Sequence, residues 1–301
     1  MKKGRSLLVV GAFIMSVSAV FGQGADYAFK VLANKGTNEI KSGNAWVAVK
    51  TGASLKKDDE LKLAENSYVG LVSVGGKPLE LKASGSYKVA DLLNQVAQGT
   101  SVLNKYTDFI LSSNSAEAKK NRLSATGGMH RGVGQIKVFL PENNNSDVYG
   151  NIVIINWEQK HGPYTVTLKN MFDDQLAVIE TPETSAQIDL NAKEYASESA
   201  ILAEVVSKGD GKLKSEAYLM KRLNPQHAEK IKAEIATEFG PNIEETAINK
   251  YLLAAFYEQR KLYIDAVTAY EQAIKLAPDV PSYKEAYEEF LLRNKLKIQN
   301  P

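Results

Sequence analysis

The feature that most constrains the fold of this chain is a change in the spacing of its apolar residues near Asn224. Before that point, apolar side chains come in short runs or alternate with polar ones, which is typical of β-strands. After it, they recur at helical intervals. The sequence therefore predicts a multidomain α+β chain with most of its strands first and a helical segment last.

The N-terminus has the pattern of a cleaved secretory signal. Basic residues within Met1–Arg5 precede an apolar run from Leu7 to Val20, and small residues follow. That run is too short to span a bilayer, so we expect residues 1–22 to be a signal peptide and the mature chain to have no transmembrane segment. The alternatives are a retained membrane anchor and a buried helix.

Composition excludes several classes of chemistry. The sequence contains no cysteine, which excludes disulfides, thiolate nucleophiles, cysteine–zinc sites and a lipid-modified cysteine. Its 37 basic and 35 acidic residues nearly balance. Such a balance gives no basic patch for nucleic acid, so we expect no nucleic-acid partner.

Two strand-rich regions are predicted, joined by a connector. Residues 29–90 contain short runs such as Tyr68–Val72, separated by turn residues, and are expected to form a small all-β domain. Residues 135–223 contain about seven strands, typical of an immunoglobulin-like or fibronectin-like β-sandwich. Between them, residues 91–134 are predicted as a helical connector that continues, from Ser113, as a glycine-containing linker.

The final region, residues 224–301, is predicted to form four helices at 228–239, 243–258, 264–276 and 283–296. The middle pair has the relative spacings of a tetratricopeptide repeat, carried by Leu253, Ala254, Tyr257, Ala266, Tyr270, Ala273 and Pro278. The resemblance implies a tetratricopeptide-like helical domain with a concave peptide-binding face. On that face we expect a partner to contact Tyr257, Arg260, Tyr263 and Tyr270. The alternative is a helical cap that packs on its own β domain, with some of these tyrosines buried.

The first β region resembles the FecR-like domains of bacterial envelope proteins. The resemblance is carried by residues 41–55, 55–61, 75–81 and 85–89. Together with the tetratricopeptide-like helices, it implies a FecR-like envelope protein, exported to the periplasm or envelope of a Gram-negative bacterium. Such domains are usually non-catalytic.

Catalytic patterns are weak. The histidines, His130, His161 and His227, form no metal-binding pair in sequence, and the glycine-rich stretch 127–134 lacks the form of a phosphate-binding loop. The acidic run Asp58–Glu60 does not have the spacing of a calcium loop, so a polar turn is expected there. We therefore expect no enzyme, no cofactor and no metal site.

Two functions are compatible with these patterns. The first is an exported adaptor or scaffold that binds other exported or envelope proteins. The second is a carbohydrate- or peptidoglycan-binding module, in which Trp46 and Trp157 stack on sugars. The exposure of the two tryptophan rings distinguishes these functions, because a sugar-binding surface needs aromatic rings open to solvent on one side of a sheet.

Overall fold

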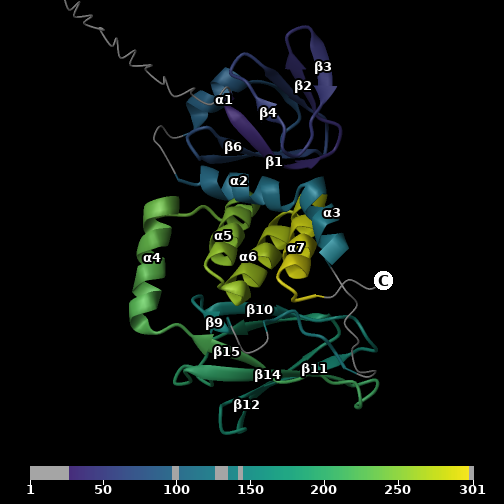
Figure 1. Ribbon diagram of the computed structural model, residues 1–301, viewed down its shortest axis with the longest axis vertical. Helices are drawn as coiled ribbons and strands as arrows, with labels where there is room; N and C mark the ends of the chain where they lie inside the picture. Colours follow the sequence, from purple (N-terminus) through teal and green to yellow (C-terminus); the bar gives the residue numbers. More distant parts are fainter. Residues whose placement is uncertain (1–26, 97–101, 126–134, 142–144, 298–301) are drawn as a thin grey trace, which may run out of the picture.

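The computed structural model describes residues 27–96, 102–125, 135–141 and 145–297. Within these residues the chain is mixed α+β, with seven helices and four sheets. Figure 1 shows three layers along the long axis: a β unit at each end and helices between them. The signal peptide predicted for residues 1–22 and the glycine-rich stretch 127–134 lie outside the described residues.

The first β unit consists of two four-stranded antiparallel sheets, in the orders β4-β1-β6-β7 and β3-β2-β5-β8. Apolar side chains from both sheets meet in one core, which includes Phe29, Leu61 and Leu71. Its strands are β1 (Phe29–Lys35), β2 (Glu39–Ser42), β3 (Ala45–Ala48), β4 (Ser54–Leu55), β5 (Glu60–Leu63), β6 (Tyr68–Ser73), β7 (Pro78–Leu81) and β8 (Gly85–Lys88).

Strand β6 is buried on both faces, which explains its continuous apolar run. Successive side chains of a strand point to opposite faces. Val69 and Leu71 therefore enter the core of the first β unit, whereas Tyr68 and Val72 belong to the helical core. One strand thus contributes to two cores and joins the first β unit to the helices.

The second β unit has a two-stranded sheet, β10-β13, and a five-stranded sheet, β12-β11-β14-β15-β9, in which β15 and β9 are parallel. Residues of both sheets share one core, and Ile264 from a helix enters it. The strands are β9 (Asp147–Val148), β10 (Ile152–Asn156), β11 (Tyr164–Lys169), β12 (Gln175–Thr181), β13 (Ser185–Asp189), β14 (Ala200–Ser207) and β15 (Tyr218–Arg222).

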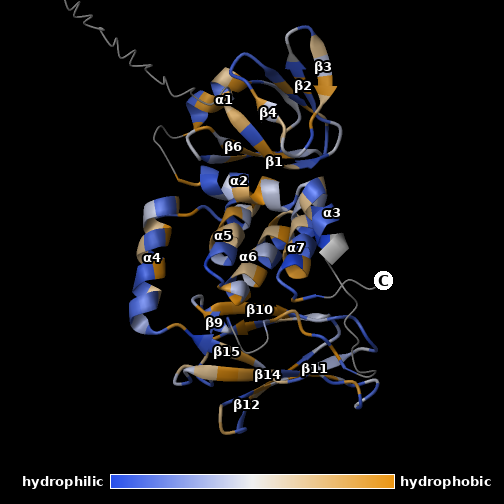
Figure 2. Cartoon of the chain, in the orientation of Figure 1, coloured by the Kyte–Doolittle hydropathy of each residue, from blue (hydrophilic) through white to orange (hydrophobic). Residues whose placement is uncertain are grey.

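The central helical layer consists of α5 (Ala247–Gln259), α6 (Tyr263–Leu276) and α7 (Pro281–Arg293), and it packs against both β units. Figure 2 shows that apolar residues are frequent in these helices and in the strands they meet. The tyrosine hydroxyls of Tyr68 and Tyr283 lie 2.6 Å apart on the side of the first β unit. On the opposite side, the Ile154 N–H donates to the Thr268 hydroxyl over 2.9 Å.

Helix α4 (Pro225–Phe239) lies beside the central helical layer, along one side of the molecule, and extends from the second β unit to the level of the first connector helices (Figure 1). Asn224 caps it by accepting a hydrogen bond from the backbone N–H of His227. The helix therefore begins at Pro225, three residues earlier than the apolar spacing predicts. Its partly buried apolar residues, Ile231, Ile235 and Phe239, pack on the helical core.

The connector region contains α1 (Val89–Gln95) and α2 (Asn104–Ser113), in agreement with the prediction of a helical connector. It also contains α3 (Ala116–Ala125), so the interpretation of this part as a linker is wrong. The segment is rich in strong helix formers but lacks an apolar stripe, and for that reason spacing alone does not reveal it.

The boundaries of the last helices also differ from those expected. Helix α5 begins at Ala247, where Thr246 caps it, rather than at Ile243. Helix α7 begins at Pro281 and ends at Arg293, and proline is favoured at a first helical position. No helix among the described residues is long and apolar enough to cross a bilayer.

Candidate functional site

The four residues expected to bind a partner occupy very different environments. Tyr270 is fully buried, and its ring centroid lies 5.6 Å from that of Tyr287 and 5.1 Å from that of Phe290. A buried ring offers no surface to a partner. In this structure Tyr270 is therefore a packing residue, not a contact residue, because the helices close around it.

Tyr257 and Tyr263 are partly buried. The Tyr257 ring lies 6.2 Å from that of Tyr149, and the Tyr263 ring lies 6.2 Å from that of Phe290. Burial, followed by the nearby charge of Asp265, raises the pKa of the Tyr257 hydroxyl well above its ordinary value, so this group stays protonated. Much of the surface of both tyrosines is therefore buried in contacts within the chain.

Arg260 joins helix α4 to the rest of the molecule. Its guanidinium donates to Glu234 over 2.6 Å, to Glu238 over 3.1 Å and to the hydroxyl of Tyr106 over 3.0 Å. It also lies 3.5 Å from the ring centroid of Phe256, in a cation–π arrangement. Its donors are therefore used inside the molecule, and the structure does not bring the four predicted residues together as an open site.

The two tryptophans lie in different environments. Trp157 is 2% exposed and packs edge-on against Tyr164, with 5.4 Å between ring centroids. Trp46 is 39% exposed on β3, and the ammonium groups of Lys41 and Lys62 lie 5.7 and 5.8 Å from its ring centroid. The paired aromatic platform considered for sugar binding is therefore not formed, and one exposed ring remains.

The residues considered for catalysis do not converge. His161 and His227 are exposed in separate parts of the fold, and His130 lies outside the described residues. Asp59 accepts a hydrogen bond from the backbone N–H of Lys56 over 2.8 Å, as expected of a polar turn. In the part of the chain that the structure describes, no group of three or more His, Asp or Glu side chains could hold a metal ion.

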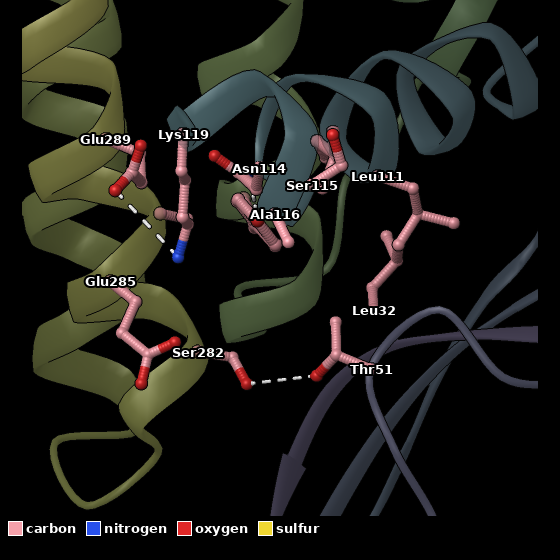
Figure 3. A pocket seen from close by; sticks show the side chains of 13 residues that line it. Leu32, Thr51, Leu111, Asn114, Ser115, Ala116, Lys119, Ser282, Glu285 and Glu289 are labelled. Atoms are coloured by element: carbon pink, nitrogen blue, oxygen red, sulfur yellow. Dashed lines mark hydrogen bonds and ion pairs between the residues drawn. The ribbon is translucent and has the colours of Figure 1, made fainter. Parts of the chain in front are cut away.

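A cleft of about 350 Å³ lies where the first β unit, helices α2 and α3, and the central helical layer meet (Figure 3). On one side, Leu32 and Thr51 of the first β unit line it. The Thr51 and Ser282 hydroxyls lie 3.5 Å apart and join this side to α7. Five separate segments of the chain thus build the cleft: Leu32, Thr51, residues 110–119, Tyr251 of α5 and residues 282–289 of α7.

A polar network forms the inner wall of the cleft. The Asn114 side-chain amide donates to the Tyr251 hydroxyl over 3.1 Å, and its oxygen accepts from Arg293 over 3.3 Å. Arg293 is in turn held by Glu258, through two hydrogen bonds of 2.6 Å. Bidentate pairs of this kind are rigid, so the inner wall has a fixed shape.

The outer part of the cleft carries charges of both signs. Lys119 of α3 and Glu285 and Glu289 of α7 face it (Figure 3). Glu289 forms a close ion pair with Arg122, and its carboxylate lies 3.8 Å from the Lys119 ammonium. Sequence analysis did not identify this site, because Lys119 stands in the presumed linker and its neighbours are far away in the chain.

Comparisons with known proteins do not assign the chain to a family: it matches no protein-family model and no curated protein.

Proposed function

We propose that this protein is an exported, non-catalytic adaptor of the bacterial envelope that holds two apolar contact tips at opposite ends of a rigid frame. The observation that carries this proposal is the position of its exposed apolar side chains. At one end, Trp46 and Val47 on β3 are 39% and 53% exposed. At the other end, Met171 and Phe172 at the β11–β12 turn are 56% and 87% exposed.

Large apolar side chains that are left exposed on an edge strand or at a turn can mark protein contacts. Strand β3 and the β11–β12 hairpin lie at opposite ends of the long axis (Figure 1). The central helical layer packs against both β units, so it fixes the separation of the tips. This geometry suits a protein that bridges two partners better than one that closes around a single substrate.

The proposal includes the architecture inferred from resemblance. We assign the first β unit to the FecR-like domains, the second to the immunoglobulin-like or fibronectin-like sandwiches, and the helices to tetratricopeptide-like hairpins. The supporting observations are two sheets around one core in each β unit and the close packing of α5 on α6. In this assignment the helices act as an internal spacer, and partners contact the β units rather than the helices.

Site-specific photo-crosslinking in the native envelope tests the proposal. A photoreactive residue at Phe172 and another at Trp46 are each expected to capture a defined protein, and the two captured proteins differ. Lys230, exposed on the side of α4, is the matched control position and should capture neither. If both tips give the pattern of the control, the adaptor proposal is wrong.

The second candidate, a glycan-binding module, is favoured by a single observation: the exposed Trp46 ring between two lysines. Aromatic faces stack on sugars, and flanking lysines can attract acidic groups. In this case purified cell-wall material should retain the protein, and Trp46→Ala should abolish retention while Phe172→Ser leaves it unchanged. The opposite pattern, or no retention, would eliminate the glycan candidate.

A further inference from the structure

Strand β3 is an edge strand whose outer side is open. It pairs with β2 alone at one end of its sheet, and all of its residues are exposed. Edge strands are usually protected by a charged residue or a proline, because an open strand can pair with another chain. The edge strands β7, β8 and β12 carry Pro78, Lys88 and Glu180, respectively, whereas β3 (Ala45–Ala48) has neither kind of residue. Strand β3 therefore lacks the usual protection against pairing.

The register of the β2–β3 pair shows which backbone groups of β3 point away from the sheet. The Val49 N–H donates to the Asn38 carbonyl over 2.8 Å, and hydrogen-bonded and non-hydrogen-bonded pairs alternate along an antiparallel ladder. The backbone groups of Val47 therefore face β2, and the N–H and C=O groups of Trp46 and Ala48 point outward. No residue that the structure describes forms a hydrogen bond with these outward groups, so an added strand can pair with them.

The two large side chains of β3 lie on opposite faces of the sheet. Val47 stands opposite Ile40, a core residue of the first β unit, so it lies on the core face. It is nevertheless 53% exposed, because no strand follows β3 in the sheet. Trp46 lies on the outer face. An added strand would place one side chain beside Val47, where an apolar residue fits, and others beside Trp46.

The outer face beside Trp46 carries more lysines than glutamates. The strand register places these charged residues on it: Lys41, Lys62, Lys88, Glu39 and Glu60. The ammonium groups of Lys41 and Lys62 are directed toward the Trp46 ring, and neither forms an ion pair with any residue that the structure describes. This face therefore favours acidic side chains in a partner.

We propose that the tip at β3 binds its partner by strand addition. An extended segment of the partner pairs with the outward backbone groups of Trp46 and Ala48, covers Val47 with an apolar side chain and places acidic side chains on the outer face near Lys41 and Lys62. In strand addition, main-chain hydrogen bonds give affinity and alternate side chains give specificity. This inference rests on the proposed adaptor function, and it names the kind of segment that one of the two tips takes.

Selection of peptides tests this inference with a defined probe. A random library of peptides about ten residues long, displayed on phage, is panned against residues 23–301, the chain without its predicted signal peptide. We expect the enriched peptides to have Asp or Glu alternating with β-branched or aromatic residues. With such a peptide bound, amide hydrogen exchange at Trp46 and Ala48, followed by NMR, should slow at least about 10-fold, whereas exchange at Val47, whose N–H faces β2, should change little.

Substitutions test the open edge and the charges in turn. Val47→Lys places on β3 a residue that opposes strand pairing, and the selected peptides should bind this variant at least about 10-fold more weakly. The double variant Lys41→Gln/Lys62→Gln should weaken their binding at least about 5-fold. Its matched control, Lys212→Gln/Lys230→Gln, removes two exposed lysines from the second β unit and α4, and it should bind like the wild type.

The inference is overturned if no peptide is enriched, if the enriched peptides have no excess of acidic residues, or if a bound peptide leaves exchange at Trp46 and Ala48 unchanged. It is also overturned if exchange at these amides slows with rising protein concentration and no peptide, because a second copy of the chain then occupies the edge. If Trp46 still crosslinks to an envelope protein when any of these results is obtained, strand addition alone is refuted and the adaptor proposal stands.

Discussion

Asp265 is a buried carboxyl at the start of α6, and its charge makes a measurable prediction. It is 5% exposed and accepts hydrogen bonds from the backbone N–H groups of Tyr149 over 2.9 Å and Gly150 over 2.7 Å. Burial is the largest effect on this group and raises its pKa from 3.8 to about 6, although the two hydrogen bonds act in the opposite direction. The native state therefore binds this proton more tightly than the unfolded state does.

The contribution of Asp265 to stability is fully present below about pH 3.8, and it is lost as the pH rises through about 6. One pKa unit corresponds to about 1.4 kcal/mol, so the complete loss is about 3 kcal/mol. Asp265→Asn cannot titrate. The free energy of unfolding of the wild type, relative to this variant, should thus fall by about 2 kcal/mol between about pH 4 and pH 7.

Urea unfolding of both proteins across this range measures the difference, and other titrating groups cancel in the comparison. The carboxyl carbon of Asp265, followed by NMR, gives the pKa independently. If the wild type instead gains stability relative to Asp265→Asn as the pH rises, the two backbone hydrogen bonds outweigh burial, and the reasoning is refuted.

Three further predictions concern the contacts of the central helical layer. Gly70→Ala places a methyl 3.2 Å from Ile248 and should lower the free energy of unfolding by about 1–3 kcal/mol, whereas Gly211→Ala, in open space, should change it little by the same urea assay. Tyr68→Phe leaves the Tyr283 hydroxyl buried without that partner and should cost about 1–3 kcal/mol. Adding Tyr283→Phe should then cost less than it does alone, in a double-mutant cycle. Arg260→Ala should lower the free energy of unfolding by about 1–2 kcal/mol and accelerate hydrogen exchange in α4 but not in α7. If exchange in α4 is as slow in the variant as in the wild type, Arg260 does not hold α4 to the rest of the molecule.

Local sequence patterns predict the elements of this fold better than their arrangement. The buried run at 68–73 identifies a strand, because a continuous apolar segment needs cover on both faces. It does not reveal that part of the cover on one face comes from helices more than 170 residues later. Tyr68 and Tyr283 are 215 positions apart in the chain, and a single sequence does not predict contacts between residues so far apart.

The candidate site was less predictable than the fold. Tyr270 has the spacing of a repeat residue, but spacing cannot say whether a ring faces a groove or another helix, and here it faces Tyr287 and Phe290. Lys119 and Glu285 are ordinary surface charges in sequence. They come together only because folding brings α3 and α7 to the same cleft.

The helices at the middle of this molecule follow both β units in the order of the chain. During synthesis the N-terminal segments appear first, so the apolar face that the first β unit presents to α5, α6 and α7 stays uncovered until these helices are made. Premature termination after Gly240 would leave Tyr68 and Val72 of the first β unit without their cover. Damage near the C-terminus should therefore make the distant N-terminal half prone to aggregation and proteolysis.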